Sequence, residues 1–229
     1  MCSGIGVCHR AAALLNACNA SVALRGVFAC DVGRSPRKVL SADFPGLRVF
    51  GDVAADGARL PPCDVLVAGF PCQPFSAANR RRKGSADERC QVIEHILRYI
   101  ERAAPKLVLL ENVVGLLSYG RDVFLALTRR LQAAGYSIAL QTLRSDVHGG
   151  VPQCRRRLFI MALLSPSAAV AWPAPIAPCT LPSILSAAAG PPVRQGRGPP
   201  PQKRPLRSTQ SSEVWRAAGS QRRRPPTWL

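Results

Sequence analysis

Acidic and aromatic side chains are scarce in this sequence. Its 229 residues contain 13 Asp and Glu but 31 Lys and Arg, which gives a formal net charge of +18. Phe, Trp and Tyr make up only 6% of the chain, so aliphatic side chains and alanine must fill any core. The basic excess favours an anionic partner, and nucleic acid is the usual one. The alternative is a basic tail without a binding role, since part of the excess lies after residue 190.

Long apolar runs, paired cysteines and clustered histidines are missing as well. No run approaches the roughly 18 residues of a membrane-spanning helix, and residues 1–17 lack the basic start and apolar stretch of a signal peptide. We therefore expect an intracellular protein, located in the nucleus if its source is eukaryotic and in the cytoplasm otherwise. The nine cysteines include no CxxC pair and the three histidines lie at no zinc-ligand spacing, which argues against a disulfide framework and against a metal site.

The composition changes near residue 165. Before it, apolar runs alternate with turn residues, whereas from about residue 172 the chain is rich in Pro, Gly, Ser and Arg. Such a segment buries too little apolar surface to offset its conformational entropy. We therefore predict a folded domain over residues 1–165 and a mostly disordered tail over residues 166–229.

Within the predicted domain, strands alternate with helices. Apolar runs predict strands at residues 27–31, 47–50, 65–68, 107–110 and 158–161. Helices are predicted between them, one with its apolar face over residues 92–100 and another over residues 123–131. Most of the strands are apolar throughout, as expected when helices cover both faces of a sheet. The pattern favours an α/β fold with an open, doubly wound and mostly parallel sheet, whose ligands bind at the carboxyl ends of the strands.

A glycine-rich turn, Ser3-Gly4-Ile5-Gly6, opens a helix near the start of the chain. Glycines there let the backbone approach a ligand, and Asp31, at the end of the next strand, can accept hydrogen bonds from ribose hydroxyls. Asp52, after the following strand, can accept from an adenine amino group. Each Asp could equally be a helix cap or a turn residue, but the ordered set favours a nucleoside cofactor. No strand precedes the turn, so we expect that either the first strand is absent or the chain is a fragment.

The loop Gly69-Phe70-Pro71-Cys72-Gln73-Pro74-Phe75-Ser76 leaves the carboxyl end of a predicted strand. Prolines on both sides of Cys72 stiffen the loop and hold the thiol in one place. A lone cysteine is more often an inert core residue than a nucleophile. The four basic residues at 80–83 change that expectation, since nearby positive charge favours the reactive thiolate.

Two further segments complete the set: Glu111-Asn112-Val113 at the end of a strand, and residues 150–157, which contain Gln153, Arg155 and Arg157. Together with the loop and the turn they resemble the cytosine carbon-5 DNA methyltransferase family. Residues 51–53 resemble its adenine-side motif and residues 87–89 a further short motif, so the resemblance runs from about residue 2 to residue 165 in family order. It implies the Rossmann-like fold of S-adenosylmethionine-dependent methyltransferases, and methyl transfer from that cofactor to carbon 5 of cytosine in DNA.

The resemblance also assigns a role to each residue of the site. Cys72 would add to carbon 6 of the base, and Glu111 would offset the charge that develops on the ring, at nitrogen 3. Arg155 and Arg157 would hold the carbonyl oxygen of the base and the DNA phosphate, and the base would be flipped out of the duplex. Supporting residues of the loops are Pro71, Gln73, Asn112 and Gln153. No metal is expected, and the expected cofactor contacts are Ser3, Gly4, Ile5, Gly6, Asp31, Asp52 and Val53.

The sequence departs from the family after residue 165, where neither a target-recognition domain nor the closing motif of the cofactor pocket is recognisable. Smaller departures are Asp31 in place of the usual glutamate and a short insertion between Asp146 and Gly150. We therefore expect that this chain carries the catalytic half of the enzyme and is inactive alone. It would then be either a truncated gene product or a subunit that needs a second chain. Two other functions stay open: the tRNA-cytosine branch of the family, and a non-catalytic DNA-binding remnant.

Overall fold

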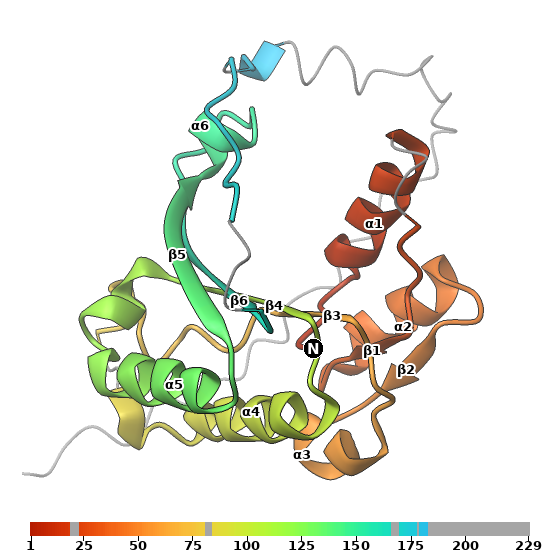
Figure 1. Ribbon diagram of the computed structural model, residues 1–229. Helices are drawn as coiled ribbons and strands as arrows, with labels where there is room; N and C mark the ends of the chain where they lie inside the picture. Colours follow the sequence, from red (N-terminus) through yellow and green to blue (C-terminus); the bar gives the residue numbers. More distant parts are fainter. Residues whose placement is uncertain (19–22, 81–83, 166–169, 178, 183–229) are drawn as a thin grey trace, which may run out of the picture. The chain divides into compact units, whose positions relative to one another are not determined.

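Helices and strands alternate along the computed structural model, which describes residues 1–18, 23–80, 84–165, 170–177 and 179–182 (Figure 1). The α-helices are α1 (Val7–Cys18), α2 (Arg34–Asp43), α3 (Val53–Asp56), α4 (Gln91–Ala103), α5 (Arg121–Ala133) and α6 (Ser145–His148). The strands are β1 (Phe28–Cys30), β2 (Arg48–Phe50), β3 (Val65–Ala68), β4 (Leu107–Asn112), β5 (Ser137–Arg144) and β6 (Arg156–Leu163).

All of these elements belong to the first of two compact units, Met1–Ala188. Most of the tail predicted at 166–229 lies outside the described residues, and the boundary at residue 165 stays a prediction. In the described ranges, no helix is both long and apolar enough to cross a bilayer.

The strands form two sheets. β1 and β2 pair in parallel, with Cys30 opposite Phe50, and the larger sheet has the order β3-β4-β6-β5. β3 and β4 are parallel because α4 crosses over between them, whereas β6 runs antiparallel to both β4 and β5. Three strands of the larger sheet thus share one direction, which confirms the predicted α/β fold with a mostly parallel sheet.

The strand β5 is missing from the set predicted from the sequence. It contains Gln141 and Thr142 and most of its side chains are half-buried, so it has no continuous apolar run. The five predicted runs are all strands, but β6 is longer than predicted because it pairs with both β4 and β5. It begins at Arg156 and therefore includes Arg157, which the predicted strand left out.

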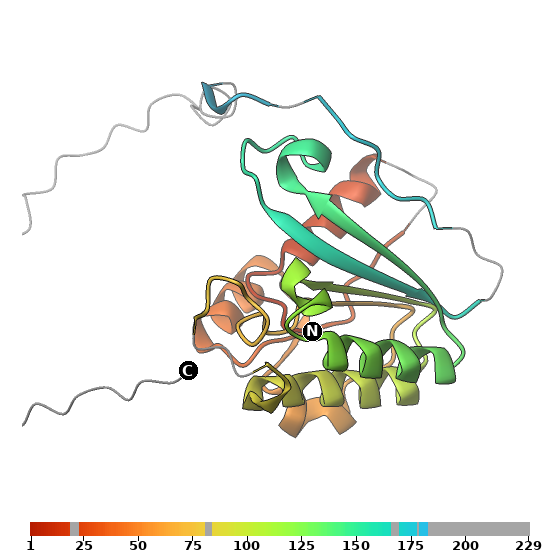
Figure 2. The same ribbon diagram turned by 90° about the vertical axis from the view of Figure 1, so that its left-hand side faces the viewer.

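Helices α4 and α5 lie side by side against the larger sheet (Figure 2). Their buried faces are the ones that the periodicity predicts, and the half-buried Val92, Val123 and Phe124 lie at their margins. The fully buried side chains are Ile93, Ile96, Leu97, Tyr99 and Ile100 of α4, and Leu127 and Leu131 of α5.

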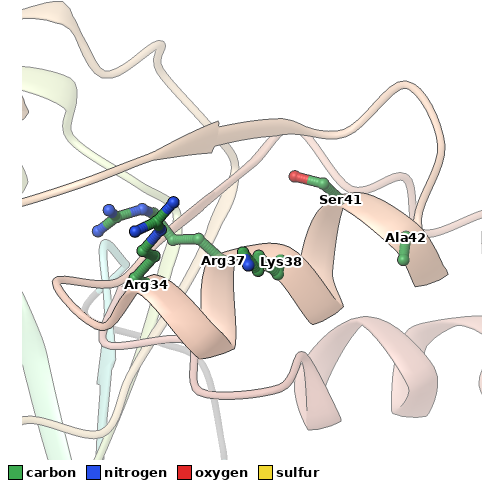
Figure 3. Close-up of a pocket in the computed structure, with 5 residues that line it drawn as sticks. All are labelled: Arg34, Arg37, Lys38, Ser41 and Ala42. Carbon is green, nitrogen blue, oxygen red and sulfur yellow. The ribbon is translucent and has the colours of Figure 1, made fainter.

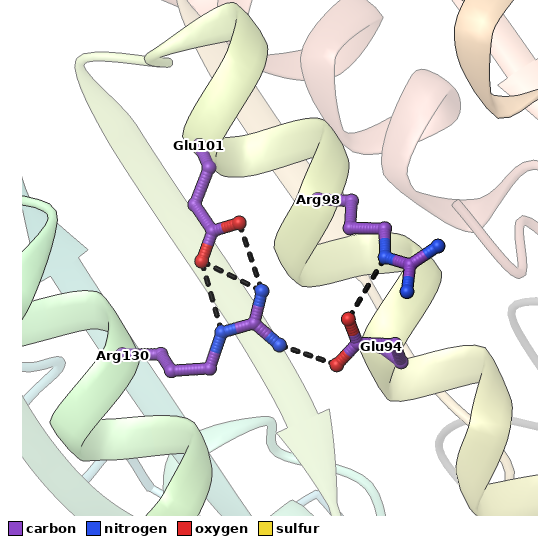
Figure 4. A network of polar contacts seen from close by, with 4 residues as sticks. All are labelled: Glu94, Arg98, Glu101 and Arg130. Atoms are coloured by element: carbon purple, nitrogen blue, oxygen red, sulfur yellow. Dashed lines mark hydrogen bonds and ion pairs between the residues drawn. The ribbon is translucent and has the colours of Figure 1, made fainter.

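Charged side chains tie α4 to α5 (Figure 4). Arg130 of α5 donates to the two carboxylate oxygens of Glu101 at 2.8 and 2.9 Å and also pairs with Glu94. Glu94 in turn accepts from Arg98, one turn along α4, at 2.8 Å. Because these side chains are 33–68% exposed, each pair contributes less than about 1 kcal/mol. The network therefore sets how the two helices align more than it adds to stability.

Three strand ends meet at one edge of the larger sheet. β3 ends at Ala68, just before the loop that contains Cys72, and β4 ends one residue after Glu111. Because β3 and β4 are parallel neighbours, both ends lie at the same edge. β6 runs the opposite way and therefore begins at this edge, at Arg156. The fold thus brings together three segments that are far apart in the sequence.

Candidate active site

Buried aromatic side chains hold down the loop after β3. Phe70 and Phe75 are 3% and 0% exposed, and the amide of Phe75 donates to the Cys72 carbonyl at 3.0 Å. The buried side chain of Asn112, at the end of β4, donates to the Phe70 carbonyl at 3.2 Å. Cys72, between these anchors, is half-buried. The loop therefore presents its thiol from a backbone that is fixed at both ends.

Glu111 is the charged centre of this edge. Its Oε1 accepts from Arg157 Nε at 2.9 Å and lies 3.9 Å from Arg155 Nη2. Glu111 faces Phe159 across the ladder, and Arg157, two residues before Phe159, points to the same face of the sheet. The other oxygen, Oε2, lies 3.3 Å from where a β-carbon on Gly69 would stand. The carboxylate thus lies between the arginines and the start of the Cys72 loop.

The turn at residues 3–6 packs against the end of β1. The Ser3 amide donates to the Cys30 carbonyl at 3.0 Å, and Ser3 Oγ accepts from the Cys30 amide at 3.1 Å. The Gly4 amide donates to Asp31 Oδ2 at 2.8 Å. Gly4 and Gly6 have φ angles of 52° and 83°, a region that favours glycine. A β-carbon at Gly4 would meet no atom within 4 Å, so the backbone there faces open space that a ligand could enter.

The two predicted cofactor carboxylates follow neighbouring parallel strands. The Asp31 amide donates to the Phe50 carbonyl at 3.2 Å, and both side-chain oxygens of Asp31 accept from backbone amides. Asp52 caps α3, since its Oδ1 accepts from the Ala54 amide at 2.9 Å. Both acids therefore make the turn or cap contacts of the alternative interpretation. A carboxylate oxygen has further lone pairs, so these contacts leave each acid able to accept from a nucleoside.

The side chains of the remaining predicted members make no hydrogen bond to a described residue. Gln73 and Gln153 are exposed, and their hydrogen bonds involve backbone atoms. Pro71 is half-buried, Val53 is 5% exposed and Ile5 is 54% exposed. The structure therefore brings together the Cys72 loop, the glutamate and the arginines, but not the side chains of the two glutamines.

Arg37 of α2 joins the two loops that carry the predicted cofactor carboxylates, and the sequence did not predict it. Its Nη1 donates to the carbonyls of Asp31 and Val32 at 2.9 and 2.7 Å. It also lies 3.8 Å from where a β-carbon on Gly51, the first residue after β2, would stand. The guanidinium group thus fixes the backbone after β1 and lies beside the loop after β2. No signal marks this residue among the 31 Lys and Arg of the chain.

A family model described as C-5 cytosine-specific DNA methylase matches residues 1–215. The chain belongs to this family. The match includes the turn at residues 3–6, the Cys72 loop, Glu111 and both arginines, which are the segments that the fold gathers. It also confirms the resemblance on which the sequence analysis rests.

The chain spans half or less of the length of the curated relatives that it matches first. M.NlaX, a type II methyltransferase of Neisseria lactamica, is 35% identical over 160 residues, which cover 69% of this chain and 50% of the relative. M.BsuFI, a type II methyltransferase of Bacillus subtilis, is 35% identical over 137 residues, which cover 59% of this chain and 33% of the relative.

Solved structures share the fold of this chain. The methyltransferase EhMeth of Entamoeba histolytica has a TM-score of 0.58 at 19% identity and covers 77% of this chain and 55% of its own. A DNA modification methyltransferase encoded within a prophage of E. coli has a TM-score of 0.56 at 22% identity and covers 70% of this chain and 44% of its own. At these identities the likeness shows the Rossmann-like methyltransferase fold alone.

Arg89 is a second residue of the methylase domain whose place only the structure reveals. Its guanidinium donates to both oxygens of the buried Asp87, at 2.8 and 2.6 Å. This hydrogen bonding raises the pKa of Arg89, and the charge of the Asp87 carboxylate adds to the rise. The sequence marks residues 87–89 only as a short family motif. The pairing of Arg89 with Asp87 depends on how the chain folds just before α4.

Proposed function

We propose that the chain is the catalytic half of a DNA (cytosine-5-)-methyltransferase, which moves a methyl group from S-adenosylmethionine to carbon 5 of cytosine in DNA. The observation that carries the proposal is the meeting of the Cys72 loop, Glu111 and Arg157 at one edge of the sheet. The cytosine-specific DNA methylase family supports DNA as the acceptor. Because the chain spans half or less of its relatives, the activity of the whole enzyme belongs to the proposal.

Cys72 is the proposed nucleophile. Its sulfur forms a bond to carbon 6 of a cytosine flipped out of the duplex, and the electron pair of the ring double bond becomes available at carbon 5. S-adenosylmethionine, when bound, would supply the methyl group as an electrophile, and the electron pair of the broken carbon–sulfur bond would stay on the sulfur of the departing S-adenosylhomocysteine. A base then takes the proton from carbon 5, and the returning electron pair expels Cys72 as a thiolate. Carbon 5 thus gains one methyl group and loses one proton, and the thiolate is regenerated.

Glu111 and the arginines are proposed to hold the base during this addition. Glu111 lies beside the start of the Cys72 loop, where it can bind ring nitrogen 3 and offset the charge that develops there. Arg157 is only 21% exposed, and its Nε holds the Glu111 carboxylate in place through an ion pair of 2.9 Å. Arg155 is 50% exposed and lies farther from the carboxylate, so it can turn towards the carbonyl oxygen of the base or a phosphate.

The cofactor assignment predicts a loss of affinity in Asp31→Ala. The open space beside Gly4 and the remaining lone pairs of Asp31 fit the ribose of S-adenosylmethionine. A hydrogen bond to a charged group contributes about 1.5–3 kcal/mol, so we expect binding to weaken roughly 10- to 100-fold. Retention of radiolabelled S-adenosylmethionine by the purified chain measures this. Asp43→Ala is the matched control, because it removes a surface acid of α2 that pairs with Arg10. Equal affinity of the two variants would contradict the role of Asp31.

The choice of acceptor tests the reaction itself. With labelled S-adenosylmethionine, we expect methyl transfer to duplex DNA and not to tRNA, and a covalent adduct with a duplex that contains 5-fluorocytosine. Preferential transfer to tRNA would move the chain to the tRNA branch of the family. Retention of DNA without any adduct would leave a DNA-binding remnant.

We further propose that a second chain supplies target recognition and the closing part of the cofactor pocket. Helix α1, directly after the glycine turn, supports this because none of its residues is buried. Val7, Ala11, Leu14 and Leu15 recur at the spacing of one helical face, and Val7, Leu14 and Leu15 are 66%, 67% and 54% exposed. Such an apolar face fits a protein partner.

The second-chain proposal has a test of its own. We expect the purified chain alone to methylate duplex DNA slowly and without sequence preference. Robust, sequence-specific methylation by this chain alone would contradict the second chain, while the assignment of Cys72 would stand.

A further inference from the structure

Helix α2 carries a stripe of basic side chains outside the site described above. Arg34, Arg37, Lys38 and Ser41 recur at i, i+3, i+4 and i+7, which places them on one helical face. With Ala42 they line a shallow, open depression of about 500 Å³ in the surface, and Figure 3 shows these five side chains. The side chains of Arg34 and Arg37 extend towards the same side of the helix. Like charges gathered in this way repel one another unless an anion lies between them.

Two charges of this stripe, those of Arg34 and Lys38, are not compensated within the described part of the chain. Arg34 and Lys38 are exposed and form no ion pair or hydrogen bond with a described residue. Asp43, the acid of α2, is already paired with Arg10. Basic residues on other elements do have acidic partners, as in the pairs Arg98–Glu94, Lys106–Asp64, Arg130–Glu101 and Arg144–Asp146. What distinguishes the stripe is that Arg34 and Lys38 lie one turn apart on the same helical face as Arg37.

Arg37 is the fixed member of the stripe. Its Nη1 is held by the carbonyls of Asp31 and Val32, and the side chain is half-buried. A guanidinium group carries five N–H donors in a rigid fork, so the donors outside these two bonds stay available in a set orientation. Arg37 thus places an oriented cation between the unpaired cations of Arg34 and Lys38. Such a group of cations can bind phosphate oxygens.

We propose that this stripe binds the phosphate backbone of duplex DNA. The inference rests on the proposed function, because it takes DNA as the substrate. Phosphate contacts in protein–DNA complexes come from Arg, Lys and Ser side chains, which are the polar residues of the stripe. From Arg34 to Ser41 the stripe extends about 10 Å along the helix, while successive phosphates of one strand are spaced by about 3.4 Å of duplex axis. Two or three phosphates can therefore lie along it.

The test is the salt dependence of DNA binding by Arg34→Gln/Lys38→Gln. Each phosphate contact contributes a slope of roughly −0.9 to log K against log salt, so loss of two contacts should flatten the slope by about 1.8. We would measure fluorescence anisotropy of a labelled duplex with the full chain across a salt series. Arg37 is left unchanged because it also fixes the backbone beside Asp31. S-adenosylmethionine binding should not change in the double variant.

The matched control removes the same charge from another surface. Arg121 and Arg129 of α5 are both exposed and have no ion pair with a described residue, so Arg121→Gln/Arg129→Gln should leave the slope unchanged. If the slope flattened equally in the two double variants, the proposal would be overturned, because DNA binding would then depend only on net charge. Competition by inorganic pyrophosphate with no change of slope would overturn it too, and would indicate a small-anion site. If the parent chain binds DNA through the stripe but forms no adduct with 5-fluorocytosine DNA, the proposed function fails and this inference stands.

Discussion

Replacing Cys72 with alanine is expected to abolish the covalent adduct with 5-fluorocytosine DNA and to lower methyl transfer by a factor of roughly 10⁴ or more. In the proposed reaction the Cys72 thiol makes carbon 5 nucleophilic by adding to carbon 6, and alanine cannot form that bond. Denaturing gels of the protein–DNA adduct and transfer of a labelled methyl group measure the two effects. Because Cys72 is half-buried and its anchors are the neighbouring Phe70 and Phe75, the fold should persist.

The matched control for this variant is Cys154→Ala. Cys154 is an exposed thiol next to Arg155, so it shares the neighbourhood of the site without a place in the loop after β3. It should retain both the adduct and the transfer. An adduct that persists in Cys72→Ala and disappears in Cys154→Ala would refute the assignment of the nucleophile.

Replacing Gly115 with alanine is expected to damage the same loop from outside. A β-carbon at Gly115 would overlap the backbone carbonyl of Phe75, whose amide is bonded to the Cys72 carbonyl. Phe75 is fully buried, so the loop and not a flexible side chain must move. Overpacking of this kind costs about 1–3 kcal/mol. Urea unfolding should show this loss, and formation of the Cys72 adduct should slow severely because the thiol is displaced.

Gly57→Ala provides the comparison for this substitution. Gly57 has φ −50° and ψ −41°, and a β-carbon there would meet no atom within 4 Å. The change should leave stability the same or raise it by about 0.4–1 kcal/mol, since alanine restricts the unfolded chain. If both variants unfolded at the same urea concentration, the close approach of Gly115 to Phe75 would not affect the free energy of unfolding.

The fold could be predicted from the sequence wherever burial is continuous. The run at 65–68 is β3 itself, and the faces of α4 and α5 follow from apolar residues at helical spacing. β5 escaped prediction because Gln141 and Thr142 interrupt a half-buried strand at the edge of the sheet. Its partner β6 was predicted too short, because hydrogen bonding on both sides extends a strand beyond its apolar centre.

The sequence motifs predicted which residues belong to the candidate site but not how those residues contact one another. The motifs name Glu111, Arg155 and Arg157 without saying which arginine holds the carboxylate. The antiparallel register of β6 decides this in favour of Arg157. Arg37 and Arg89 act through folded backbone and through a buried acid, and neither contact leaves a mark in local composition.

The pairing register of β6 with β4 also limits the insertions and deletions that the strand can tolerate. Side chains alternate between the two faces of a strand, so gain or loss of one residue within 156–163 would turn Arg157 away from Glu111. Residues 151–155, which precede β6, are exposed and belong to no strand. We therefore expect natural variants to contain no insertions or deletions within residues 156–163.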